Sequence, residues 1–167
     1  MNLNDIRDDE TVVVDANILL YAIQKESQQC KRLLLRCADG DLTCIVPMHI
    51  LAEVMHVLII SEARDNGWIT GGNPAKQLAS KPELIKRLIR YETLMRDLLA
   101  VGFQLEPLMK EDFISAMTIQ KQFGLLTNDA LFVAVGQRFR TKAIVSADKV
   151  FSEVLGVMVY MPDDMSI

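Results

Sequence analysis

The sequence has few of the features that mark a secreted or membrane protein. Its three cysteines, Cys30, Cys37 and Cys44, are odd in number and lack the spacing of a metal site. We therefore expect free thiols packed as small apolar residues in a reducing compartment, without a disulfide. No apolar run approaches the roughly eighteen residues of a membrane span, and the acidic N-terminus lacks the order of a signal peptide. We predict a cytoplasmic protein with no membrane association.

The chain also lacks a positive net charge. Eighteen Lys and Arg residues against twenty-two Asp and Glu residues give a formal charge of −4. A nucleic acid would therefore need a local basic patch or metal ions to bind. The 167 residues, half of them hydrophobic, suffice for one domain with a well-buried core. We expect a single domain over residues 1–167, with its core in residues 11–160.

Apolar runs alternate with helical patterns along the chain. They predict strands at 11–14, 43–46, 103–105, 143–146 and 157–161, and helices at 27–38, 47–64, 81–100, 110–123 and 127–139. Segment 66–80 is rich in Gly, Pro and Asn with little apolar period, which predicts a mobile flap. The alternation of strands and helices indicates an α/β fold, with a mostly parallel sheet covered by helices on both faces.

Four acidic residues stand where strands end or helices begin. Asp15 and Asp148 follow apolar runs, whereas Glu53 and Asp129 lie in the early turns of helices. These positions share one edge of a parallel sheet. Two carboxylates about 4 Å apart repel by roughly 4 kcal/mol at an effective dielectric near 20, so four together need a cation. Hard cations such as Mg²⁺ and Mn²⁺ suit carboxylate ligands, and this donor set predicts metal-assisted phosphodiester hydrolysis.

Each of these acids also has a purely structural interpretation. Asp15 could cap the helix that follows it, Asp148 could begin a turn, and Asp129 could complement the dipole of its helix. Glu53 differs because its neighbours make its helix apolar nearly all round. We therefore expect Glu53 to be largely buried, where an unpaired carboxylate is costly.

Four segments resemble, in order and spacing, the conserved segments of PIN-domain ribonucleases: VVVDANILLYA, PMHILAEVMHVL, TNDALFVAVG and IVSADKVF. The resemblance implies a three-layer α/β/α fold with a central, mostly parallel five-stranded sheet. It implies a Mg²⁺- or Mn²⁺-dependent endoribonuclease acting on RNA, commonly the VapC-type toxin of a toxin–antitoxin pair. The expected partners are then an antitoxin protein and a second copy of the chain in a homodimer.

The same resemblance assigns roles to individual residues. The metal ligands and catalytic residues would be Asp15, Glu53, Asp129 and Asp148. The groups that orient ligands or water would be Asn17, Ser146 and Thr127.

Three alternatives remain open from the residues alone. His49, Glu53 and His56 lie at positions i, i+4 and i+7 of one helix, a spacing that could hold a transition metal. Asp15 and Asn17 after an apolar strand are also similar to phosphatases that use an Asp nucleophile, although their second Asp is replaced here by Asn17. The third alternative is a non-catalytic protein-interaction module with vestigial acids, because helices 50–60 and 84–99 offer a large apolar surface.

Two groups of basic residues are candidates for RNA contact. The first comprises Lys76, Lys81, Lys86, Arg87 and Arg90, and the second comprises Arg138, Arg140 and Lys142. Each group could equally be a solvated face or the favourable end of a helix. The single tryptophan, Trp68, could stack on a base, but we expect it to pack beneath the flap.

Overall fold

A parallel sheet organises the chain in the computed structural model, which describes residues 1–24 and 26–165. Its strands are β1 Thr11–Val14, β2 Thr43–Pro47, β3 Gln104–Glu106, β4 Ala143–Val145 and β5 Met158–Tyr160. They follow the order β3-β2-β1-β4-β5, and each neighbouring pair is parallel. In β1, Val13 aligns with Ile45 of β2 and with Ile144 of β4. The apolar run of β1 is fully buried because helices cover both faces of the central strands.

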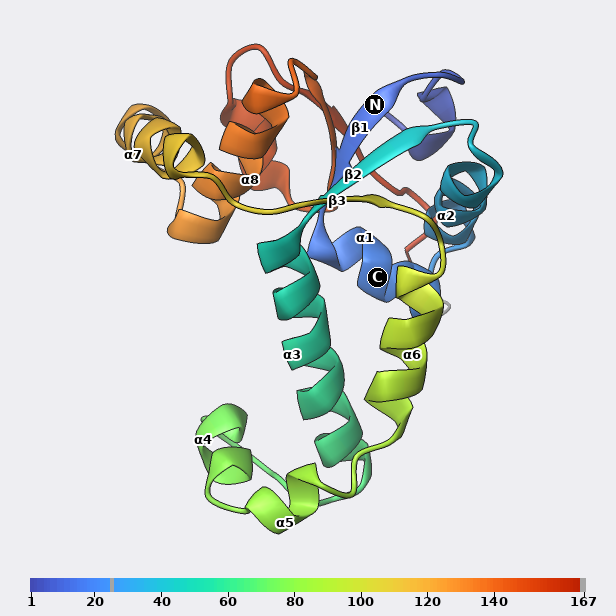
Figure 1. The fold of residues 1–167 in the computed structure, drawn as a ribbon, viewed down its shortest axis with the longest axis vertical. Helices are drawn as coiled ribbons and strands as arrows, with labels where there is room; N and C mark the ends of the chain where they lie inside the picture. The colour runs from blue at the N-terminus through green and yellow to red at the C-terminus, as the bar shows by residue number, and fades with distance from the viewer. Residues whose placement is uncertain (25, 166–167) are drawn as a thin grey trace.

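Helices cover the sheet from both sides, as the sequence predicts (Figure 1). The larger helices are α1 Ala16–Ile23, α2 Gln28–Asp39, α3 Met48–Asp65, α6 Arg90–Leu99, α7 Lys110–Phe123 and α8 Thr127–Arg138. The shorter ones are α4 Pro74–Ala79, α5 Pro82–Ile85 and the 3-10 helices η1 Leu3–Asp5 and η2 Lys149–Glu153. Helices α7 and α8 lie on one side of the sheet, and α1, α2 and α6 lie on the other. This is the three-layer α/β fold of the prediction.

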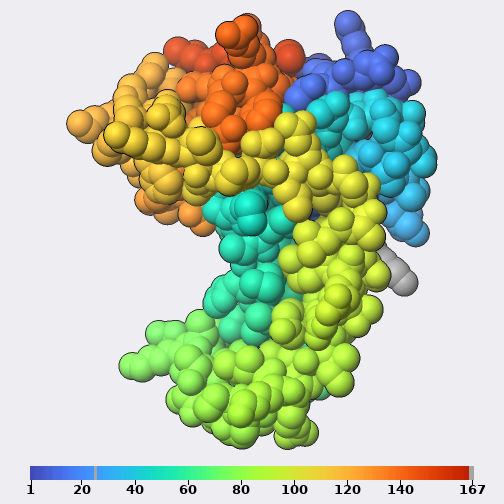
Figure 2. Space-filling view, in the orientation of Figure 1, coloured from blue at the N-terminus to red at the C-terminus, as the bar shows by residue number. Residues whose placement is uncertain are grey.

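An arm projects from the body of the molecule (Figures 1 and 2). It consists of the C-terminal half of α3 together with α4, α5 and the start of α6. A small hydrophobic cluster of its own fills the arm, made of Ile60, Ala63, Ile69, Leu78 and Leu88. Trp68 packs against this cluster, as expected from the sequence.

Glu62 ties the two long helices of the arm together. Its carboxylate is 7% exposed and accepts hydrogen bonds from the backbone N–H groups of Ile89, Arg90 and Tyr91, at 2.9, 3.0 and 2.8 Å. These amides begin α6, where N–H groups have no partner within the helix. A buried acid on α3 therefore caps α6.

The structure differs from the sequence analysis at two points in this region. Segment 66–80 is not a continuous loop, because it contains the helix α4, which begins at Pro74 after Asn73, whose side chain accepts a hydrogen bond from the Lys76 amide at 3.2 Å. The mobility of this segment stays a prediction. The single helix predicted over 81–100 is two helices, because Glu62 captures the amides of residues 89–91 and starts α6 afresh there.

The expectation of three free thiols is also wrong. Cys37 and Cys44 form a disulfide with their Cα atoms 5.9 Å apart, and Cys30 is free and buried. Gly40, with φ at +81°, reverses the chain between α2 and β2 and brings the two cysteines together. Within residues 1–24 and 26–165, no helix is long and apolar enough to cross a membrane.

Candidate metal centre

The predicted acids lie around the carboxyl ends of β1 and β4. Asp15 follows β1 and Ser146 follows β4, and the Asp15 amide donates to the Val145 carbonyl at 3.0 Å. The order of strands reverses between these two neighbours, since β2 and β3 lie on one side of β1 while β4 and β5 lie on the other. Ligands of open parallel sheets bind at such a switch point.

Asp15 is held by three hydrogen bonds. Its Oδ1 atom accepts from the Ala16 amide at 2.7 Å, which also caps α1. Its Oδ2 atom accepts from Ser146 Oγ at 2.6 Å and from Asn17 Nδ2 at 2.8 Å. Asp15 is thus a helix cap through Oδ1, as its structural interpretation expects. Its Oδ2 atom is held in place by the side chains of Ser146 and Asn17.

Ser146 and Asn17 connect β1 to the segment that carries Asp148. The fully buried Ser146 hydroxyl accepts from the Asp148 amide at 3.0 Å and from Asn17 Nδ2 at 3.2 Å. Asn17 Oδ1 accepts from the Ala147 amide at 3.0 Å. Asp148 is exposed, and its Oδ1 atom caps η2 by accepting from the Val150 amide at 2.9 Å. Asn17 and Ser146 therefore orient Asp15 directly and Asp148 through its backbone.

Glu53 and Asp129 approach this edge from two other helices. Glu53 lies on α3 and is exposed, so the expectation of a buried carboxylate is wrong. The apolar side chains around it pack to either side while its own position faces outward. Its Oε2 atom accepts from Asn128 Nδ2 at 3.3 Å, and Asn128 immediately precedes Asp129 in the first turn of α8. Asn128 is thus a site residue that was not predicted, although its place before an acid at a helix start was visible in the sequence.

The charges of these acids affect one another. Burial raises the pKa of Asp15 above its usual range; the Ser146 and Ala16 hydrogen bonds oppose this shift, and the charges of Glu53 and Asp129 add to it. Burial also raises the pKa of Asp129, and the charges of Asp148 and Glu53 raise it further. Asp15 and Asp129 therefore both lie within reach of the charge of Glu53, and a positive charge placed near them would be stabilised.

The donor atoms at this edge fit a hard divalent cation. Four carboxylates, an amide oxygen and a hydroxyl are the ligands and outer groups that Mg²⁺ and Mn²⁺ prefer. In the described part of the chain, no three acidic, histidine or cysteine side chains already converge closely enough to form a complete set of ligands. The residues thus match such an ion in their chemistry.

A cavity of about 460 Å³ opens beside these groups. It is lined by Asn17, Tyr21, Ala147, Asp148 and Lys149. Tyr21 and Lys149 were not predicted as site residues; Lys149 carried a signal, since it follows Asp148 directly and places a cation beside the acids.

The structure separates the two histidines of the alternative metal site. Both ring nitrogens of His49 are buried without a hydrogen-bond partner, whereas His56 is exposed. Burial lowers the pKa of His49, and the charges of Glu53 and Asp112 oppose the shift. Among the residues that the structure describes, His49, Glu53 and His56 do not form a group that could hold a metal ion.

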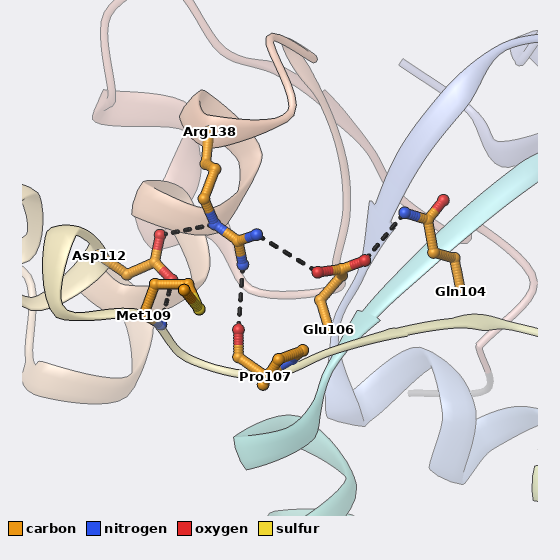
Figure 3. Close-up of polar contacts among 6 residues, drawn as sticks. All are labelled: Gln104, Glu106, Pro107, Met109, Asp112 and Arg138. Atoms are coloured by element: carbon orange, nitrogen blue, oxygen red, sulfur yellow. Dashed lines mark hydrogen bonds and ion pairs between the residues drawn. The ribbon is translucent and has the colours of Figure 1, made fainter.

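Two further predicted residues, Thr127 and Arg138, make contacts that were not predicted. The Thr127 hydroxyl accepts from Gln120 Nε2 at 3.5 Å, so it faces α7 across the α7–α8 hairpin. Arg138 is engaged inside the protein (Figure 3): it pairs with Asp112 at 3.0 Å and Glu106 at 3.3 Å. Its guanidinium also donates to the Pro107 carbonyl at 3.0 Å. Arg138 is therefore not available to RNA, while Arg140 and Lys142 are exposed.

The first basic group lies on the arm. All five are exposed: they lie on α4, at the two ends of α5 and at the start of α6. The group comprises Lys76, Lys81, Lys86, Arg87 and Arg90. Along α3, Glu53 lies at the end near the acids and Asp65 at the end near the basic group. These two residues are twelve positions apart, which is about 18 Å of helix. The structure therefore does not bring these residues to the acids.

Comparison with known proteins identifies the family. A family description, the PIN domain, matches residues 12–156, and the chain belongs to this family. A toxin–antitoxin complex from Klebsiella pneumoniae is structurally similar, with a TM-score of 0.56 and 15% identity over 88% of this chain and 95% of the other. A second similar structure is VapBC2 from Rickettsia felis bound to a DNA fragment from its promoter. It has a TM-score of 0.58 and 16% sequence identity, and the match covers 92% of this chain and 99% of the other. A search of curated protein sequences finds no significant match.

Proposed function

We propose that this PIN-domain protein is a metal-dependent endoribonuclease and the toxin of a type II toxin–antitoxin system. The observation that carries the proposal is the shared environment of Asp15, Glu53, Asp129 and Asp148 at the switch point of the sheet. Neighbouring acids whose charges raise the pKa of Asp15 and of Asp129 are unfavourable for the protein alone and suit a site that binds a cation.

In this proposal the four acids hold Mg²⁺ or Mn²⁺, which when bound supplies Lewis acidity and a water of lowered pKa. Asn17 and Ser146 fix the Oδ2 atom of Asp15 and so keep that carboxylate in one orientation. Asn128 does the same for Glu53. Lys149, beside Asp148 in the cavity, is placed to contact a phosphate oxygen of the RNA.

The partners follow from the structural neighbours and from the surface. The two similar structures are toxin–antitoxin complexes, and we infer an antitoxin partner for this chain by analogy. Its membership of the PIN-domain family leads us to propose a cytoplasmic location. Helix α7 and its flanks expose large apolar side chains, namely Met109, Phe113, Ile114, Met117 and Leu126. Exposed apolar surface of this kind marks a protein interface, and we propose that it serves a homodimer of single-domain chains.

Cleavage of RNA tests the proposal. The wild type should hydrolyse a single-stranded RNA with Mg²⁺ or Mn²⁺ and not with EDTA. Asp15→Asn should abolish cleavage, and Ser146→Ala should lower it about 10- to 100-fold, since it loosens the orientation of a ligand. The matched control is Asp97→Asn, an exposed acid on α6, which should retain full activity.

The other candidate function is a protein-interaction module without catalysis. The exposed apolar surface of α7 favours it. Such a protein would bind its antitoxin equally with and without a divalent cation. It would not cleave RNA, whichever divalent cation is added. Cleavage that survives Asp15→Asn would contradict the proposed site and point to a contaminating nuclease.

A further inference from the structure

One end of the molecule has more basic than acidic residues. Residues 64–90, which we name the arm tip, contain six Lys and Arg residues and two Asp and Glu residues. The whole chain carries a formal charge of −4. The arm tip is therefore a basic surface on an otherwise acidic protein, and it is the part of the molecule to which a polyanion is attracted.

Two basic side chains of the arm tip contact Trp68. The guanidinium of Arg87 lies over the Trp68 ring, 4.9 Å from its centre, and Lys81 Nζ donates to the Trp68 carbonyl at 3.4 Å. Lys76, Lys81 and Lys86 are exposed, and no lysine among the described residues takes part in an ion pair. These ammonium groups are free to pair with phosphates.

One face of α3 connects the acids to the arm tip. Glu53, Val57, Ile60 and Arg64 follow one another at spacings of three and four residues and so share a face of the helix. A cavity of about 330 Å³ borders this face and includes Pro74 of α4 in its lining. In Figure 2, α3 forms the floor of a hollow between the body and the arm tip.

We propose that the arm tip binds the backbone of the RNA substrate at a distance from the bond that is cleaved. This inference rests on the proposed function. The acids repel an RNA strand until a cation is bound, so affinity has to come from another surface. The path along α3 from Glu53 to the arm tip is about 18 Å long. Because stacked nucleotides rise by about 3.4 Å each, an RNA strand bound at the acids reaches the arm tip after about five nucleotides.

Trp68 and Arg87 favour a nucleic acid over an acidic protein segment. An indole covered by a guanidinium is a flat, cationic surface of the kind on which RNA bases stack. Acidic peptides gain nothing from such a surface beyond charge. Only an RNA long enough to reach the arm tip gains these contacts, so the arm tip should make the protein bind long RNA more tightly than short RNA.

Binding without cleavage tests the proposal directly. The probe is a fluorescein-labelled single-stranded RNA of 20 nucleotides, added to the full chain in EDTA and followed by anisotropy over a range of salt concentrations. The test variant is Lys76→Gln, Lys81→Gln, Lys86→Gln; the control is Lys31→Gln, Lys110→Gln, Lys121→Gln, which removes the same charge from exposed positions of α2 and α7. Thermal melts verify that both fold.

The test variant should bind the RNA at least about tenfold more weakly at 0.1 M salt, and its salt slope should fall by about 2, as expected for three lost phosphate contacts on a single strand. The control should lose less than about twofold. Trp68 is the only tryptophan, so its fluorescence should change when unlabelled RNA binds the wild type. Equal weakening of both variants, or none, would overturn the proposal.

A competition distinguishes RNA from a protein partner. A 20-residue peptide of Asp and Glu should displace the RNA only weakly and leave Trp68 fluorescence unchanged. Tighter binding of the peptide than of the RNA would overturn the proposal in favour of a protein interface.

Cleavage assays then separate this inference from the proposed function. The triple variant should cleave a 4-nucleotide RNA as the wild type does and a 20-nucleotide RNA with a raised KM. A wild type that binds RNA through the arm but never cleaves it would refute the proposed function and leave the arm assignment intact.

Discussion

Removal of the Asp112 side chain should destabilise the protein strongly. Asp112 is 2% exposed, pairs with Arg138 at 3.0 Å and accepts from the Met109 amide at 2.8 Å, which caps α7. Loss of a helix cap costs about 0.5–2 kcal/mol, and breaking a buried ion pair costs about 3–5 kcal/mol. Arg138 is 27% exposed and keeps Glu106 and a carbonyl as partners, so the second cost is smaller here. We expect Asp112→Ala to lower the free energy of unfolding by about 3 kcal/mol.

Urea denaturation at pH 7 and 25 °C measures this change. Asp112→Asn should cost less, about 1–2 kcal/mol, because the amide oxygen can still cap α7. Asp97→Ala is the control on an exposed surface and should leave the unfolding midpoint almost unchanged. A double-mutant cycle with Arg138→Met should give a coupling of at least about 1 kcal/mol. A loss below about 1 kcal/mol for Asp112→Ala, or an additive cycle, would refute this reasoning.

Three further predictions concern other parts of the chain. Reduction of the Cys37–Cys44 disulfide, or Cys44→Ser, should lower the free energy of unfolding by about 2.5 kcal/mol in urea, as expected for a loop of about eight residues. The pKa of Glu62 is lowered because three backbone hydrogen bonds and Arg90 outweigh its burial. Its stabilisation is therefore present above the pKa of the unfolded state and lost as the pH falls through the folded value, so Glu62→Gln should flatten the acid branch of Tm against pH. The pKa of Asp129 is raised, so its ionised form costs stability at pH 7, and Asp129→Asn should raise Tm in EDTA and abolish the further rise with Mn²⁺.

Strands and their order of appearance could be predicted from the sequence because buried parallel strands read as apolar runs. The run Thr11–Val14 is such a case, and its abrupt end at Asp15 also marks the switch point. The break before α6 could not be predicted, because Glu62 acts from another helix on amides far along the chain. Pairing of Cys37 with Cys44 likewise depends on a reversal at Gly40 whose tertiary consequence the cysteine spacing alone does not reveal.

The candidate site could be predicted in part for the same reason. Asp15 and Ser146 follow strands directly and Asn17 lies in the first turn of α1, so the geometry of a parallel sheet brings them together. Exposure of Glu53 could not be read from its apolar neighbours, since the direction of one side chain depends on how α3 leaves the sheet. The contact of Asn128 with Glu53 joins two helices and likewise requires the fold.

Calorimetric titration of Mn²⁺ into the wild type and three variants tests the central claim most directly. Four carboxylates that share one environment should bind the ion together. Loss of a residue that only orients a metal ligand typically weakens metal binding about 10- to 100-fold, so loss of a ligand itself should cost at least as much. We therefore expect Mn²⁺ binding to weaken at least about tenfold in each of Asp15→Asn, Glu53→Gln and Asp129→Asn. Asp97→Asn should bind Mn²⁺ as the wild type does. Equal Mn²⁺ affinity in the wild type and all three variants would show that these acids do not form a metal centre.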